Sequence, residues 1–238
     1  MVINNLIETH CHILPAVDDG ARDVETSLQM IAALKEQGAK KIISTSHYYS
    51  DSVSLESFVE KRDAAYKGLK AALPPDSPEI LLGAEVYISR FMMNNEDITP
   101  VCIQGTRYLL LEHPFSDKFD EKTINRVERL SYDYNVTPIL AHIERYHGLM
   151  SNKNALDALR DIGCLTQVNI SSFADLPMLA KRKLFKYLES GQIDIIGSDC
   201  HNMGSRSPSY EAGAQAIIDK FGESALQELV MRANDIFK

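Results

Sequence analysis

The segment GSDCHNMGSRS, residues 197–207, carries side chains that suit two different phosphate chemistries. In one interpretation, Cys200 and Arg206 form the Cys–x5–Arg spacing of a loop that cradles phosphate around a thiolate nucleophile. In the other, Asp199 and His201 are metal ligands at positions i and i+2. A thiolate loop needs free backbone N–H groups that close onto a helix N-terminus, and the residues between Cys200 and Arg206 include a single glycine. Short motifs of this kind also occur by chance.

Further metal-type side chains follow short apolar segments elsewhere in the chain. They are His10, His12, His47, Glu85, Glu112 and His142, in addition to Asp199 and His201. Because residues i and i+2 of a strand point to the same side, His10 and His12 can chelate one ion, and Cys11 and Cys200 face away. Imidazoles and carboxylates gathered in such numbers repel or desolvate one another unless cations neutralise them. We therefore favour the metal interpretation over the thiolate one.

The elements that would position these residues alternate between strand and helix. Seven short, apolar segments predict strands at 6–10, 41–47, 80–85, 107–113, 137–142, 165–170 and 193–199. Helical patterns between them cover 24–38, 55–73, 122–134, 154–163 and 177–191, and three end at Gly38, Gly163 or Gly191, as helix C-termini favour.

Repeated alternation of strand and helix predicts parallel strands joined by crossover helices, and continuous apolar strands are typical of a sheet covered on both faces. We predict an α/β fold, a (β/α) barrel with seven strands. Six of these strands end in a His, Glu or Asp. The C-terminal ends of barrel strands meet on one face, where such barrels carry their active sites.

Composition restricts the class of protein further. The chain has 238 residues with 45% hydrophobic content, enough for one domain spanning residues 1–238. A net charge of −8 disfavours nucleic acid as a partner. The sequence has no transmembrane run and no signal peptide, and its four cysteines show no CxxC pair, so we expect a cytoplasmic protein. The oligomeric state stays open.

Six motifs occur in order between residues 8 and 206: ETHCHILPAVDDGARD, STSHY, GAEVYI, YLLLEH, AHIERY and SDCHN…SR. As a set they resemble the bacterial metal-dependent protein-tyrosine phosphatases of the PHP (polymerase and histidinol phosphatase) superfamily. The resemblance is to the CpsB/YwqE type found in capsular and exopolysaccharide operons. It implies a distorted seven-stranded barrel, a trinuclear site that usually holds manganese, and phosphotyrosine as the substrate. The implied partner is a tyrosine autokinase, which could recruit the protein to the inner face of the membrane.

The resemblance also implies a ligand set for each of three divalent ions. These are His10, His12, Glu85 and Asp199 for the first, Glu85 with Glu112 and His142 for the second, and His47 and His201 with an acid of the segment VDDG for the third. Asp19 is preferred to Asp18 as that acid, although sequence alone does not separate two adjacent acids. Mixed imidazole and carboxylate ligands suit manganese, iron or zinc, so the identity of the metal stays open.

Arg145 and Arg206 follow two of the ligand strands and are expected to hold the phosphate, because a guanidinium binds phosphate oxygens in a bidentate fashion. The expected catalytic residues are Arg145, Arg206 and Asp19, which act with a metal-activated water. Tyr48, Tyr49 and Phe115 are candidates either to flank an aromatic substrate ring or to pack within their loops. Two alternatives stay open: a phosphatase of a small ester such as histidinol phosphate, and a non-catalytic regulator that binds the kinase.

Overall fold

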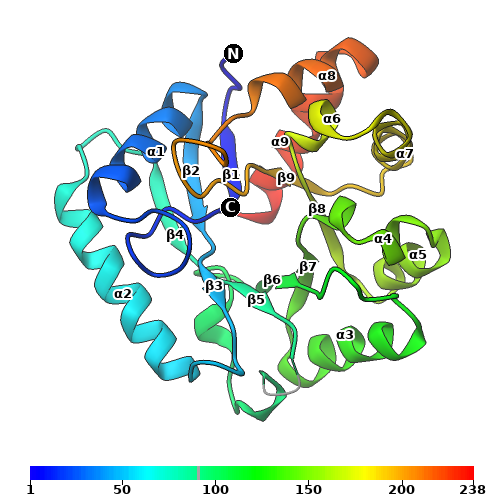
Figure 1. The fold of residues 1–238 in the computed structure, drawn as a ribbon, viewed down its shortest axis with the longest axis horizontal. Coiled ribbons are helices and arrows are strands. Elements are labelled where there is room, and N and C mark those ends of the chain that lie inside the picture. The colour runs from blue at the N-terminus through cyan, green and yellow to red at the C-terminus, as the bar shows by residue number, and fades with distance from the viewer. Residues whose placement is uncertain (90–91) are drawn as a thin grey trace.

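A curled layer of parallel strands lies at the centre of the protein, and helices surround it (Figure 1). The computed structural model describes residues 1–89 and 92–238. The strands are β1 (Leu6–Cys11), β2 (Ala39–Ser44), β3 (His47–Tyr48), β4 (Glu79–Leu82), β5 (Glu85–Tyr87), β6 (Tyr108–Glu112), β7 (Thr137–Leu140), β8 (Leu165–Asn169) and β9 (Ile195–Gly197).

The strands pair in the orders β1-β2-β4 and β3-β5-β6-β7-β8-β9, always in parallel. Residues 45–46 separate β2 from β3, and residues 83–84 separate β4 from β5, so each pair of short strands occupies one position in the order. A parallel bridge between Cys11 and Cys200 joins the end of β1 to the segment after β9. The described strands thus fill seven positions, and the predicted α/β architecture of barrel type is confirmed.

Helices cover the outer face of the strands. The α-helices are α1 (Val24–Glu36), α2 (Leu55–Ala72), α3 (Glu121–Tyr134), α4 (His147–Met150), α5 (Lys153–Asp161), α6 (Ser172–Asp175), α7 (Met178–Glu189), α8 (Glu211–Phe221) and α9 (Glu223–Ile236). Short 3-10 turns lie at Met92–Asn94, Thr99–Val101 and Ile143–Arg145. The side chains of Asp23, Ser54, Asp120 and Asn152 accept backbone N–H groups at the start of α1, α2, α3 and α5, respectively.

The three glycines predicted at helix ends, Gly38, Gly163 and Gly191, all have positive φ. The requirement for glycine is strictest at Gly38, between α1 and β2. Its φ is +102°, and a Cβ there would lie 2.2 Å from the Ile3 carbonyl oxygen. An L side chain at this position would be strained and would also collide with backbone.

The interior enclosed by the strands is apolar. Side chains from several strands meet there with the end of the last helix, namely Ile7, Ile43, Leu110, Ile139, Ile195, Ala233 and Phe237. A larger apolar cluster fills the layer between strands and helices and includes Cys11 and Cys200. Within the described ranges, no helix is long and apolar enough to cross a bilayer.

Candidate metal centre

The centre begins at the end of β1, where the strand register is irregular. The pairing with β2 shifts between Glu8 and Cys11, and the buried Glu8 carboxylate accepts the backbone N–H groups of His10 and Ser198, each at 3.0 Å. An irregularity of this kind re-aims the side chains that follow it. The Nε2 atoms of His10 and His12 come to lie 3.3 Å apart, and both rings are buried.

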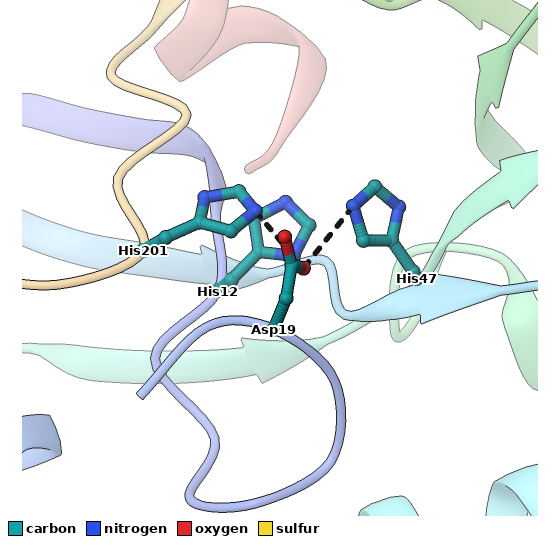
Figure 2. Close-up of side chains that lie close together, drawn as sticks. All are labelled: His12, Asp19, His47 and His201. Carbon is teal, nitrogen blue, oxygen red and sulfur yellow. Dashed lines mark ion pairs between the residues drawn. The ribbon is translucent and has the colours of Figure 1, made fainter. Parts of the chain in front are cut away.

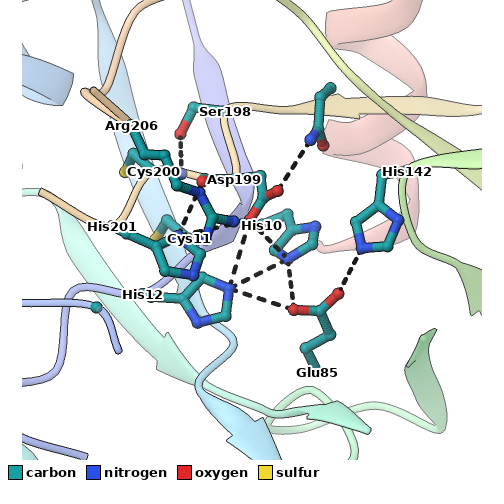
Figure 3. A network of polar contacts seen from close by, with 12 residues as sticks. His10, Cys11, His12, Glu85, His142, Ser198, Asp199, Cys200, His201 and Arg206 are labelled. Atoms are coloured by element: carbon teal, nitrogen blue, oxygen red, sulfur yellow. Dashed lines mark hydrogen bonds and ion pairs between the residues drawn. The ribbon is translucent and has the colours of Figure 1, made fainter. Parts of the chain in front are cut away.

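Glu85, at the start of β5, is the hub of the centre (Figure 3). Its Oε2 lies 3.1 Å from His10 Nε2, 3.3 Å from His12 Nε2 and 3.2 Å from His47 Nδ1. Its Oε1 lies 2.8 Å from His142 Nε2. Burial favours the protonated acid, but the charge and hydrogen bonds of the surrounding imidazoles hold the pKa of Glu85 well below its usual range.

Glu112 ends β6 and places a second carboxylate next to Glu85. Its oxygens lie 3.7 Å from His142 Nε2 and 3.8 Å from His47 Nδ1. Burial and the negative charge of Glu85 raise the pKa of Glu112 to about 7. The negative charges of Glu85 and Glu112 therefore repel each other in a buried space, and the neighbouring imidazoles do not fully neutralise them. A divalent cation bound between the two carboxylates would remove this repulsion.

Asp199 and His201 lie beyond β9 and complete the centre. Asp199 Oδ1 is 3.5 Å from His10 Nε2, and the His201 ring stacks on the His12 ring with centroids 3.8 Å apart. Asp199 has φ +54° and His142 has φ +34°, values that cost free energy in residues other than glycine. Simple strand alternation therefore does not explain how Asp199 reaches the centre, because the backbone turns there.

The two acids of VDDG have distinct positions, and Figure 2 shows that of Asp19 beside His47 and His201. The buried Asp18 carboxylate accepts from His12 Nδ1 at 2.7 Å and from the His47 backbone N–H at 2.8 Å. Burial opposes ionisation, but the His12 hydrogen bond and charge keep the pKa of Asp18 well below its usual value. Asp19 is 65% exposed, and its Oδ1 lies 3.4 Å from His201 Nε2 and 3.6 Å from His47 Nε2. Asp19 thus faces the centre, whereas Asp18 hydrogen-bonds to the His12 nitrogen that points away from it.

Three groups of these side chains each bring their ligand atoms within 4.8 Å of one another: His12, Asp19, His47 and His201; His10, His12, Glu85 and Asp199; and His47, Glu85 and Glu112. His142, the remaining expected ligand, contacts Glu85 as described above. His12 and His47 belong to two groups each, although the resemblance implies one ion for each of them.

The donor set fits divalent metal ions. The Nδ1 of His47 and the Nε2 of His201 are buried and make no hydrogen bond, although a Glu85 oxygen lies 3.2 Å from the first and an Asp19 oxygen 3.4 Å from the second. A buried polar atom is normally satisfied, so these two nitrogens have lone pairs or protons that need a partner. Imidazole nitrogen with carboxylate oxygen is a combination that suits manganese, iron and zinc.

Both expected phosphate-binding arginines point at the centre from the loops after β7 and β9. Arg145 Nη1 donates to Asp199 Oδ2 at 3.1 Å, and Arg206 Nη2 donates to Asp199 Oδ1 at 2.8 Å. Their side chains are 42% and 34% exposed, respectively, and line a cleft of about 550 Å³ beside Asp199. An anion in this cleft would meet two guanidinium groups at the edge of the metal centre.

Two polar residues of β8 support the centre and were not predicted. Gln167 Oε1 accepts the His142 backbone N–H at 2.6 Å and lies 3.2 Å from His10 Nδ1. Asn169 Nδ2 donates to Asp199 Oδ2 at 2.9 Å. Their i and i+2 spacing within β8 is a signal that places both on one face of the strand, the face of the ligands.

The thiol of Cys200 is remote from this chemistry. Cys200 is fully buried in the apolar layer, as is Cys11, whose Sγ donates to the Ile43 carbonyl at 3.4 Å. Burial, followed by the contact with Cys200, raises the pKa of the Cys11 thiol well above its usual value. A reactive cysteine is partly exposed in electropositive surroundings, and neither thiol is exposed.

Comparison with known proteins adds independent findings. A family described as capsular polysaccharide synthesis, CpsB/CapC, matches residues 6–237. The tyrosine-protein phosphatase CpsB of Streptococcus agalactiae is 29% identical over 241 residues, covering 98% of both chains. The tyrosine-protein phosphatase YwqE of Bacillus subtilis is 29% identical over 247 residues, covering 98% of this chain and 94% of the relative.

Solved structures agree in fold. A crystal structure from work on YwqE of Bacillus subtilis and CpsB of Streptococcus pneumoniae, described as "unique metal-dependent tyrosine phosphatases", superposes with a TM-score of 0.82. It is 26% identical, and the match covers 97% of this chain and 94% of the other. The phosphotriesterase homology protein of Escherichia coli superposes with a TM-score of 0.54 at 12% identity over 98% of both chains, a likeness of fold alone.

Proposed function

Because this chain belongs to the CpsB/CapC family of capsular polysaccharide synthesis proteins, we propose that it is a metal-dependent protein-tyrosine phosphatase. The observation that carries the proposal is the gathering of five imidazoles and four carboxylates on one face, with two arginines at its edge. Phosphate ester hydrolysis needs cations around the phosphoryl group, and this arrangement provides sites for metal ions beside fixed positive charge. Residues 1–238 are taken as one catalytic domain.

The proposed metal ligands are His10, His12, Asp19, His47, Glu85, Glu112, His142, Asp199 and His201. Up to three divalent ions would be held, with manganese as the proposed metal and iron or zinc as the other candidates. When bound, such ions lower the pKa of a coordinated water and neutralise phosphoryl oxygens.

The remaining steps belong to side chains at the edge of the centre. Arg145 and Arg206 would exchange their contacts with Asp199 for the phosphate oxygens, which they can bind in a bidentate fashion. Asp19 Oδ1 faces the imidazoles, and its Oδ2 lies 3.6 Å from Arg206 Nη1. In the proposed mechanism, this Oδ2 would orient Arg206 and accept a proton near the phosphate.

The proposed substrate is a phosphotyrosine protein, specifically the bacterial tyrosine autokinase that controls capsule or exopolysaccharide synthesis. Support comes from the capsular polysaccharide description of the family and from the tyrosine-phosphatase names of the relatives. The protein would act in the cytoplasm, at the inner face of the membrane when bound to this kinase.

The test compares His201→Ala with Cys200→Ser, each assayed on para-nitrophenyl phosphate with manganese and with a chelator. We expect His201→Ala and chelation to lower activity by roughly 100-fold or more, and Cys200→Ser to retain activity. Loss of activity in Cys200→Ser together with indifference to chelator would overturn the metal mechanism. Faster hydrolysis of histidinol phosphate than of a phosphotyrosine peptide would contradict the proposed substrate. No hydrolysis of any of these esters would indicate a non-catalytic regulator that binds the kinase.

A further inference from the structure

The edge of the metal centre has a cationic side and an aromatic side. Arg145 and Arg206 extend from the loops after β7 and β9, and they form the cationic side. Tyr87 ends β5, Tyr49 follows β3 directly, and Phe115 lies three residues after β6. These three rings, here called the aromatic side, therefore belong to the neighbouring strand positions of β3, β5 and β6, and β6 is next to β7, which precedes Arg145.

Two rings of the aromatic side, those of Tyr49 and Phe115, contact expected metal ligands directly. The Tyr49 ring centroid lies 5.3 Å from that of His47 and 5.5 Å from that of Tyr87. The Phe115 centroid lies 5.8 Å from that of His142, and the Arg145 guanidinium carbon lies 5.2 Å above the Phe115 ring. A group bound at the centre would thus be within reach of both exposed rings and of one arginine.

Exposure separates these rings from aromatic residues that merely pack. Tyr49 is 39% exposed and Phe115 is 50% exposed, whereas Tyr48 is buried against Phe58. Tyr48 is therefore a packing residue and cannot flank a substrate. Single exposed apolar residues are ordinary, but each of these two rings lies against an expected metal ligand, where a group bound at the centre would cover it.

A hollow beside Tyr49 extends the apolar surface. It has a volume of about 400 Å³ and is lined by Val17, Val53 and Phe58, together with the expected ligands His47 and Asp19. Polar groups that fix one end of a ligand next to apolar walls that receive its body are the usual composition of a binding site.

We propose that the aromatic side binds the phenyl ring of phosphotyrosine, while the metal centre and the cationic side hold its phosphate. The inference rests on the proposed function and assigns the preference for aryl phosphates to Tyr49 and Phe115. Phosphoserine and phosphothreonine carry the same phosphate but have no ring to cover these side chains. Offset or edge contacts between aromatic rings contribute beyond the apolar area that they bury, so their removal should discriminate between the substrates.

The experiment uses the full chain loaded with manganese, with Tyr49→Ala, Phe115→Ala and the double variant. Tyr132→Ala is the matched control, because Tyr132 is 86% exposed on α3, outside the aromatic side. Two peptides of one sequence, carrying phosphotyrosine or phosphoserine, are compared by kcat/KM. Binding of phenylphosphonate and of methylphosphonate is compared by calorimetry.

Each single variant is expected to lose about 10-fold in kcat/KM for the phosphotyrosine peptide and in affinity for phenylphosphonate. Values for the phosphoserine peptide and methylphosphonate should change by less than about twofold, and Tyr49→Phe should behave as the wild type. Because Tyr49 touches His47, manganese affinity is measured in every variant, and Phe115→Ala tests the aromatic side independently of that contact.

Equal losses for the aryl and alkyl ligands, or no loss for either, would overturn this inference alone and leave the phosphatase proposal intact. A wild-type protein that hydrolyses no phosphate monoester would instead overturn the proposed function, and this inference with it.

Discussion

Asp18 and Asp19 are adjacent in the chain, yet they contact different sides of the centre. Asp18 is buried and receives the Nδ1–H of His12, so the Nε2 of the same ring is left to face Glu85. Asp19 is exposed and faces His47 and His201. An acid that hydrogen-bonds a ligating histidine fixes its tautomer and orientation and increases its basicity.

We therefore expect Asp18→Asn to weaken metal affinity by about 10- to 100-fold, because the neutral amide holds the His12 ring less firmly. Calorimetric titration with manganese measures the affinity directly. Asp161→Asn, at an exposed position in α5, is the control. Unchanged affinity in Asp18→Asn would show that His12 needs no support from this acid.

Another acid, Asp117, lies outside the metal centre and stabilises the folded state. Its Oδ2 lies 3.2 Å from His113 Nδ1, and its Oδ1 accepts from the Thr123 hydroxyl at 2.8 Å. The hydrogen bond from His113 lowers the pKa of Asp117 from an ordinary 3.8 to about 2. Because the folded-state pKa is depressed, the stabilisation is complete above about pH 4 and disappears as the pH falls towards 2.

Asp117→Asn should lower the free energy of unfolding at pH 7 by about 1 kcal/mol, a value reduced for the partial exposure of the carboxylate. The difference from the wild type should shrink between pH 4 and pH 2, as the wild-type acid becomes protonated. Urea unfolding of both proteins at pH 7, 4 and 2.5 measures this. A difference that stays constant with pH would contradict the assigned pKa of Asp117.

At the scale of elements, the sequence predicts the strand positions and most helices, because apolar runs and helix-ending glycines are local signals. All seven predicted strands contain or overlap observed strands. All five predicted helices are observed, with ends that differ from the prediction by a few residues. The helices α8 and α9 were not predicted. The breaks at residues 45–46 and 83–84 were also missed, because they depend on how the strands curve around one another.

The difference between local signals and long-range packing also decides how much of the metal centre could be predicted. Eight of the nine expected ligands could be predicted from their positions at strand ends, and Asp19 was implied by the family resemblance alone. The register shift near Glu8 and the positive φ of Asp199 and His142 could not, because they result from long-range packing that no local pattern encodes. Gln167 and Asn169 did carry a local signal, the i and i+2 polar pair in β8.

Gly38 and Gly163 offer a matched test of helix ends, since both follow helices and both have positive φ. A Cβ at Gly163 would meet nothing within 4 Å, whereas at Gly38 it would collide with Ile3. We expect Gly163→Ala to cost about 1 kcal/mol of stability, from backbone strain alone, and Gly38→Ala to cost at least about 2 kcal/mol more. Urea unfolding measures the stability of both variants. Equal losses of stability would show that the Ile3 backbone moves away from the added Cβ without a cost in free energy.

At the scale of the whole molecule, the expected ligands come from six of the seven strand positions. Metal bound at the centre would therefore tie together segments that are distant in sequence. A ligand that binds only the folded state stabilises it by about 2.7 kcal/mol when its concentration is 100 times its Kd.

Added manganese should accordingly raise the melting temperature in a concentration-dependent manner, and chelator should lower it. His201→Ala should reduce this response, and Cys200→Ser should keep it. Differential scanning calorimetry of the three proteins with and without manganese provides the measurement. A melting temperature indifferent to manganese in the wild type would exclude tight binding to the folded state.

The bridge between Cys11 and Cys200 has a consequence for synthesis on the ribosome. The first two histidines of the centre emerge early, but Asp199 and His201 emerge only after all the described strands have left the exit tunnel. No nascent chain shorter than this can assemble the full set of ligands, however well its first strands have folded. Because of the order of the strands, an incomplete chain lacks the last two ligands and is not expected to be catalytically active.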